Sequence, residues 1–179
     1  MARGTLAAET VQAARRARYE TIRGTVVHLL AGLSTGRLDL TKPANHQQIA
    51  VAVTRLRRYL VETDEVPDPL SHELQACADA AEREGIAVDL LAPAGVIPAL
   101  PVDIRRALTE PIIEVLAATA TRARITVVAF ATEVVVAIIA DAQLAAPIAA
   151  THDDVQVAQD TEGGLWVQSR WTGLSGSPS

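Results

Sequence analysis

Two apolar stripes in the first 60 residues constrain the fold of this chain more than any other feature of its sequence. In both stripes, large apolar residues recur at alternating spacings of three and four. Such spacings place each set on one face of an α-helix, because a helix turns once in about 3.6 residues. The first stripe comprises Tyr19, Ile22, Val26, Leu29 and Leu33, and the second comprises Ile49, Val53, Leu56 and Leu60.

These stripes predict a helical hairpin that associates with a second copy. The first helix is expected over Thr10 to Leu33 and ends in the small residues that follow. Asn45 fits the N-cap of the second helix, with Gln48 three residues later as in a capping box. A hairpin of this size cannot bury both stripes by itself, so we expect a homodimer in which two hairpins form a four-helix bundle. Packing of the stripes on the rest of the same chain is the alternative.

The residues after the hairpin predict a second domain of mixed helices and strands. Two prolines among acidic residues in Thr63 to Pro69 indicate a linker, which divides a hairpin domain at 1–65 from a second domain at 66–173. The Gly/Ser-rich end, 174–179, is expected to be disordered. Segregated helices and strands indicate an α+β fold with a two-layer sandwich. Helices are expected at 70–84, ending at Gly85, and at 102–123 with a kink at Pro111; strands are expected at 86–91, 124–130, 133–139, 155–158 and 165–171.

Composition excludes several classes of function. The net charge of −5 provides no basic excess for a phosphate backbone, so we expect no nucleic-acid partner. Cys77 is the only cysteine, which excludes an internal disulfide and a multi-cysteine zinc site, and we expect no metal. The apolar run 125–140 is too short and too often interrupted by polar residues to cross a bilayer. With no signal-peptide pattern either, we expect a cytoplasmic protein without a membrane partner.

The order of these elements and one run of residues resemble a known family. The run is Leu-Pro-Val-Asp-Ile-Arg-Arg-Ala-Leu-Thr-Glu-Pro-Ile-Ile-Glu-Val-Leu, residues 100–116. It is similar to the helix that leads into the ATP-binding Asn box of bacterial sensor histidine kinases with a short dimerisation hairpin. Residues 124–127 and 133–136 look like the family's hairpin before its Asp-x-Gly-x-Gly box. The resemblance spans about 10–171 and implies a sandwich of the histidine kinase ATPase type.

The positions that carry the family's chemistry depart from its pattern. Arg23 and Gly24 stand where the family has its phosphoacceptor His and the acidic neighbour, and an arginine cannot accept a phosphoryl group. His28 lies five residues further along the helix. The resemblance places a vestigial nucleotide cleft without a cofactor at Glu114, Ala118, Ala140, Asp141 and Ala142. The family's Asn is missing at Ala118, its Asp at Ala140, and its two Gly residues at Ala142 and Leu144. The segment from Asp141 to the next strand is also shorter than the family's ATP lid.

The resemblance and its departures together imply a function. We expect a catalytically inactive, histidine-kinase-like signalling protein that binds a response regulator or a partner histidine kinase, rather than an enzyme. A basic patch at Arg15, Arg16, Arg18 and Arg23 is the candidate contact surface for an acidic partner. Two alternatives stay open: histidine phosphotransfer through His28, and binding of a small ligand in the emptied cleft.

Overall fold

The computed structural model divides the chain into two compact units, Met1–Val66 and Pro67–Ser179. The structure describes residues 20, 23–24, 26–28, 30–32, 34–37, 41–61, 68–91, 93–161 and 164–173, with backbone alone for 58–61. The predicted disordered tail, 174–179, and the linker residues 62–67 lie outside the described residues.

The first unit contains helical segments within 20–34 and the helix α2, Pro43–Val61. The first helix ends where the sequence predicted: the backbone N–H of Thr35 donates to the Ala31 carbonyl, and Gly36 follows with a φ of 66°. The predicted N-cap at Asn45 is wrong. The amides of Asn45 and His46 both donate to the Lys42 carbonyl, and Pro43 takes the first helical position, where its missing N–H costs nothing.

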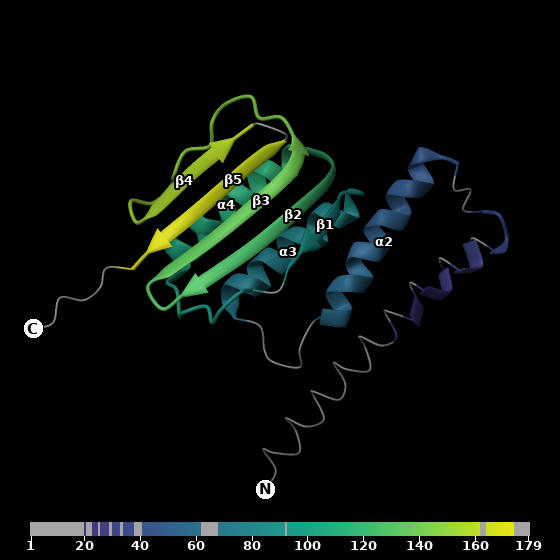
Figure 1. Cartoon of the computed structure of the whole chain (residues 1–179), viewed down its shortest axis with the longest axis horizontal. Helices are drawn as coiled ribbons and strands as arrows, with labels where there is room; N and C mark the ends of the chain where they lie inside the picture. The colour runs from purple at the N-terminus through teal and green to yellow at the C-terminus, as the bar shows by residue number, and fades with distance from the viewer. Residues whose placement is uncertain are drawn as a thin grey trace, which may run out of the picture. The chain divides into compact units, whose positions relative to one another are not determined.

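The second unit is a two-layer α+β sandwich, as predicted. Its five-stranded sheet has the order β1-β2-β3-β5-β4, in which β1 is parallel to β2 and the other pairs are antiparallel. The helices lie together on one face of this sheet (Figure 1). In chain order the elements are α3 (Pro69–Arg83), β1 (Ala87–Leu90), α4 (Val102–Ala118), β2 (Thr119–Phe130), β3 (Glu133–Ala142), β4 (Val155–Asp160) and β5 (Leu165–Thr172).

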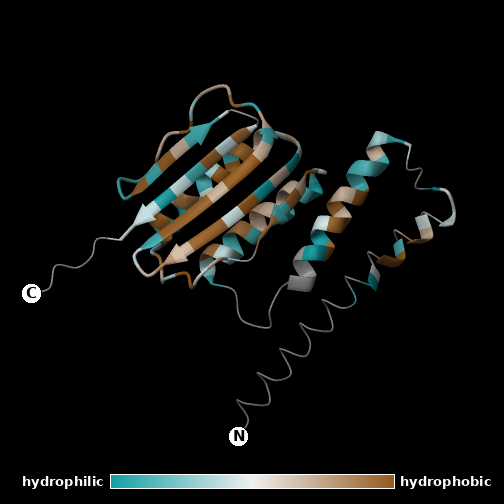
Figure 2. Ribbon diagram, viewed as in Figure 1, coloured by the Kyte–Doolittle hydropathy of each residue, from teal (hydrophilic) through white to brown (hydrophobic). Residues whose placement is uncertain are grey.

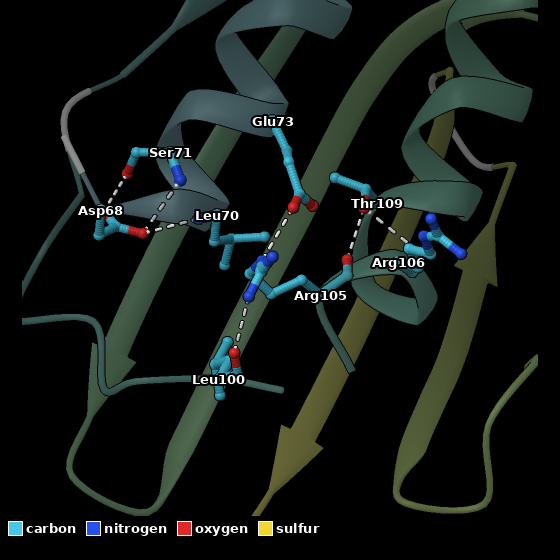
Figure 3. A network of polar contacts seen from close by, with 8 residues as sticks. All are labelled: Asp68, Leu70, Ser71, Glu73, Leu100, Arg105, Arg106 and Thr109. Atoms are coloured by element: carbon cyan, nitrogen blue, oxygen red, sulfur yellow. Dashed lines mark hydrogen bonds and ion pairs between the residues drawn. The ribbon is translucent and has the colours of Figure 1, made fainter. Parts of the chain in front are cut away.

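Helix α3 has a clear start, a buried face and a clear end. The Asp68 carboxylate accepts the backbone N–H groups of Leu70 and Ser71, each at 3.0 Å, so it caps orphan donors of the first turn (Figure 3). One face of the helix is buried in the core through Leu70, Leu74, Ala78 and Ala81. The helix ends before Gly85, whose φ of 90° confirms it as the predicted C-terminal glycine.

Helix α4 packs on the sheet but is shorter than the sequence predicted. It runs through Pro111 without interruption and ends at Ala118, so the prediction of helix over 119–123 is wrong. Those residues begin β2, because Thr119 and Ala123 pair with Ala142 and Ala140 of β3. Pairing of Thr119 and Ala123 with β3, and of Arg122 with β1, overrides a helical pattern that local spacing alone suggested.

The β2–β3 hairpin gives the sheet its central strands. The pair Phe130–Glu133 leaves Ala131 and Thr132 as the two-residue turn, as predicted. Alternate residues of the strands are buried on the helix-facing side of the sheet, and they form one core with α3 and α4. The buried Ser169 of β5 donates its hydroxyl to the Leu108 carbonyl of α4 at 2.8 Å, which joins the two layers.

The other face of the sheet, which we call the open face, is partly apolar. β3 reads Glu-Val-Val-Val-Ala-Ile-Ile-Ala-Asp-Ala, and Figure 2 shows it hydrophobic over most of its length. The exposed fractions of Val128, Ile139 and Phe130 are 37%, 53% and 60%. A strand that is apolar on both sides is typical of sheets covered on both faces. This unit, taken alone, covers only one.

Candidate functional site

The structure brings three of the five predicted cleft residues close to one another. Ala118 is the last residue of α4, and the next residue, Thr119, pairs with Ala142. Ala140 and Ala142 are two residues apart on β3, so they share the helix-facing side of the sheet. Ala140, however, is only 4% exposed and lies inside the hydrophobic core. The core therefore fills the space next to this alanine.

Glu114 and Asp141 face away from Ala140 and Ala142. Glu114 lies on the exposed side of α4, opposite the helix face that packs on the sheet. Asp141 lies between Ala140 and Ala142 on β3, and its side chain is exposed. Because successive side chains of a strand point to opposite faces, Asp141 cannot share a helix-facing cleft with its two neighbours.

The Asp141 carboxylate instead caps an irregularity in β2. The register between β2 and β3 shifts so that Ala120 to Arg122 stand opposite Asp141 alone. Asp141 accepts the backbone N–H of Thr121 at 3.0 Å and that of Arg122 at 2.9 Å, as well as the Thr121 hydroxyl. A β-bulge leaves backbone donors without ladder partners, and this carboxylate satisfies two of them.

The environment lowers the pKa of Asp141. Desolvation by partial burial acts to raise this pKa, but the hydrogen bonds from the Thr121 hydroxyl and from the Arg122 and Thr121 amides outweigh it. These bonds favour the charged form, because each donor points a partial positive charge at the carboxylate. The folded state therefore holds Asp141 ionised at a lower pH than the unfolded chain does.

We predict that Asp141→Asn destabilises the second unit in a pH-dependent way. The depressed pKa contributes stability above the unfolded pKa of about 4, and this contribution is lost as the pH falls through the lower folded pKa. Because the group is mostly exposed, we expect a loss of only about 0.5–1 kcal/mol at pH 7. Urea unfolding at pH 7 and at pH 3 measures it. The difference between wild type and variant should shrink at pH 3, whereas exposed Asp153→Asn should show no comparable loss at pH 7.

A hollow of about 540 Å³ lies beside the predicted cleft rather than in it. Of the five predicted cleft residues only Ala142 lines it. The hollow extends along the segment after β3 and reaches the end of β4 and the start of β5, through Gln143, Gln159 and Leu165. The sequence reasoning did not identify it, because a short loop of small residues has no periodicity that predicts a cavity.

The predicted phosphotransfer positions are exposed. Arg23, Gly24 and His28 all lie on described helical segments of the first unit and are accessible to solvent. The Arg23 guanidinium lies 3.8 Å from the Glu20 carboxylate. The other members of the predicted basic patch, Arg15, Arg16 and Arg18, lie outside the described residues.

Part of the predicted dimer interface can be located. Ile49 and Leu56 are half-buried on α2, Val26 is half-buried on the first helix, and Val53 is 38% exposed. Of Leu60 the structure describes the backbone alone. The remaining interface positions, Tyr19, Ile22, Leu29 and Leu33, lie outside the described residues.

Metal binding and membrane crossing find no support in the described part of the chain. Within it, no group of three or more His, Cys, Asp or Glu residues could hold a metal ion. The His152 imidazole lies 3.5 Å from the Asp103 carboxylate and serves to connect the segment before β4 with the start of α4. None of the helices described here combines the length and the apolar character that a bilayer-spanning segment requires.

Comparisons with known proteins give distant structural likenesses. No family model matches the chain, and no curated protein matches it. The chain is similar to the cytoplasmic segment of histidine kinase QseC at 13% identity and a TM-score of 0.38, over 72% of this chain and 88% of that one. It is similar to Acinetobacter baumannii histidine kinase AdeS at 12% identity and a TM-score of 0.38, over 89% and 97%. At these values neither structure assigns a family or an activity to this chain.

Proposed function

We propose that this chain is a catalytically inactive, histidine-kinase-like signalling protein that works through protein–protein contacts. It forms a homodimer through its helical hairpin and binds a response regulator or a partner histidine kinase. The observation that carries the proposal is the apolar stripe of α2, whose described side chains, Ile49, Val53 and Leu56, are only partly buried. The sequence resemblance over 10–171 gives the signalling context.

The burial of α2 supports association with a further helix. Ile49, Val53 and Leu56 recur at helical spacing on one face. Among residues 43–57, whose side chains the structure describes, none is fully buried. In the second unit, by contrast, α3 and α4 each bury a continuous face. Helices owe most of their stability in proteins to packing of such a face, so a second hairpin on α2 would stabilise both copies.

The residues at the predicted cleft positions support catalytic inactivity. Ala118 and Ala140 present no oxygen to a magnesium ion or to an adenine amino group, and Ala140 is enclosed by the core. Asp141, the one acid of the region on β3, is engaged by the backbone of β2. The Asn and Asp side chains that would bind a nucleotide are therefore missing, and Asp141 is used within the fold. Micromolar binding of ATP in calorimetry would contradict this part of the proposal.

We predict that Val53→Glu converts a dimer to a monomer. Val53 is 38% exposed in the single chain, so a glutamate is tolerated there by the monomer. In a two-fold bundle the substitution buries two unpaired carboxylates and should weaken dimerisation roughly 100-fold or more. Size-exclusion chromatography with light scattering at micromolar concentration measures the mass of both proteins.

Gln48→Glu is the matched control for Val53→Glu. It makes the same change of charge at an exposed position of the same helix, outside the apolar stripe. The control should stay dimeric while Val53→Glu becomes monomeric. A wild-type chain that is monomeric at 100 μM would contradict the dimer. Equal masses in solution for Val53→Glu and Gln48→Glu would contradict a dimer that forms through the apolar stripe.

Phosphotransfer through His28 is the second candidate function. His28 is exposed on the first helix, which a phosphoacceptor must be to meet a receiver domain. The test incubates the dimer with a phosphorylated receiver domain and compares wild type with His28→Ala and His46→Ala. Loss of phosphate uptake in His28→Ala alone would support this candidate. Equal uptake in all three proteins, or none, would remove it.

A further inference from the structure

We propose that the hollow at the end of β3 is a binding site for a small uncharged molecule that carries a carbonyl oxygen. Its volume of about 540 Å³ falls within the range of small-molecule sites in proteins. This site shares only Ala142 with the vestigial cleft that the sequence predicted, and it does not depend on dimerisation. Its case rests on three features: anchored walls, a fixed amide and described lining residues that carry no charge.

The walls of the hollow are anchored to the core of the second unit. Leu165 is 2% exposed, and Leu144 packs against the same buried cluster. The loop opposite carries Ala145, Ala146 and Pro147, whose small side chains leave the space open. Because Leu144 and Leu165 are held by the core, the walls that they form exist before any ligand arrives. A preformed site binds without the entropic cost of ordering a loop.

The amide of Gln159 has a fixed orientation in this hollow. Its Oε1 accepts the backbone N–H of Ile148 at 3.0 Å. Ile148 is 9% exposed, so its amide needs this partner inside the protein. A backbone N–H can only donate, which identifies the bonded atom as the oxygen and leaves the Nε2 group as the end of the amide available to a ligand. The hollow therefore offers a hydrogen-bond donor, with Gln143 and Thr161 as further polar groups.

The side chains that line the hollow indicate which ligand charge it favours. Among the described residues that line the hollow, there is no Lys, Arg, His, Asp or Glu. A charged ligand would lose its hydration there without gaining a counter-charge, which is costly. An uncharged molecule avoids this cost. Its carbonyl oxygen can accept from Gln159 Nε2 while its apolar body contacts Leu144 and Leu165. Lactams, lactones and simple cyclic amides have this combination.

The experiment titrates the ¹⁵N-labelled full chain with ε-caprolactam, a neutral ring with one carbonyl group. We expect saturable shifts of the amide signals of Gln143, Leu144 and Gly164, with a Kd of about 1–10 mM for so small a molecule. Cyclohexanecarboxylate, a ring of similar size with a negative charge, should cause no such shifts. Absence of the lactam shifts, or equal shifts with the carboxylate, would overturn the proposal.

Two variants separate binding in the hollow from a general effect. Gln159→Glu keeps an oxygen for the Ile148 amide but replaces the Nε2 donor with a second oxygen, so we expect lactam binding about 10-fold weaker or lost. Gln156→Glu makes the same change on the same strand, on the open face, and should bind like wild type. Equal affinity in the two variants would overturn the assignment of Gln159. Circular dichroism checks that both fold as wild type does.

Discussion

Gly95→Ala will lower the free energy of unfolding of the second unit by about 2–4 kcal/mol. Gly95 has a φ of 94°, and a Cβ placed on it would lie 2.1 Å from the Ala129 carbonyl oxygen. The backbone at Gly95 cannot move away from Ala129 without breaking hydrogen bonds. Its neighbour Ala94 donates to the Val127 carbonyl at 2.9 Å and accepts from the Ala129 amide at 2.8 Å. Alanine therefore causes both backbone strain and a clash that breaks this pairing with β2.

Gly85→Ala separates the two causes. Gly85 has a nearly equal φ of 90°, but a Cβ there would meet no atom within 4 Å. The control should therefore lose only about 1–2 kcal/mol from the left-handed backbone. Urea unfolding followed by tryptophan fluorescence reports on this unit, because both tryptophans of the chain, Trp166 and Trp171, lie in β5. Equal losses of unfolding free energy in Gly95→Ala and Gly85→Ala would show that the close approach to Ala129 does not add to the cost of the substitution.

Arg105→Met will destabilise the second unit by about 1–3 kcal/mol through the loss of a partly buried polar network. The Arg105 side chain, 16% exposed, joins three segments (Figure 3). Its Nε donates to the Glu73 carboxylate of α3 and its Nη1 to the Leu100 carbonyl, both at 2.8 Å. Methionine keeps most of the apolar stem but leaves both acceptors without this donor. The same fluorescence-monitored unfolding measures the effect.

The neighbouring arginine and a double variant make this prediction specific. Arg106 is exposed, so Arg106→Met should change stability by less than about 0.5 kcal/mol. Glu73→Gln removes the charge that Arg105→Met leaves unpaired. If the ion pair carries the effect, the double variant will be more stable than the sum of the two single losses predicts. Strict additivity would mean that Arg105 stabilises the fold through packing or through Leu100 alone.

Much of the fold was predictable from local pattern. The turn at Ala131 and Thr132 and the end of α3 at Gly85 follow from β-branched runs and from a glycine that can adopt a positive φ. One error lies where a distant partner decides, and another where a neighbouring backbone group does. Residues 119–123 continue a helical spacing, but β3 offers their backbone hydrogen bonds that a helix end cannot. Asn45 is a good cap by residue type, yet the Lys42 carbonyl already accepts the first helical bonds.

The candidate site was less predictable than the fold. Sequence reasoning placed Asp141 in a vestigial nucleotide cleft, whereas its carboxylate binds the backbone of the β2 bulge. A register shift between two strands cannot be read from either strand alone. Gln159 had no motif around it, and it became a candidate only when its amide was seen to hold Ile148 beside a hollow.

By itself the sequence determined which faces of this chain must be covered. The stripes of the hairpin and the alternation along the strands follow from the periodicity of helix and strand, so they can be read residue by residue. Only the tertiary structure decided what each polar group does. Whether Asp141 binds a ligand or a bulge, and which end of the Gln159 amide is available, depends on donors that lie 11 to 20 residues away along the chain. Hydrogen bonds act over about 3 Å, and no local pattern in the sequence specifies which distant atoms folding brings that close.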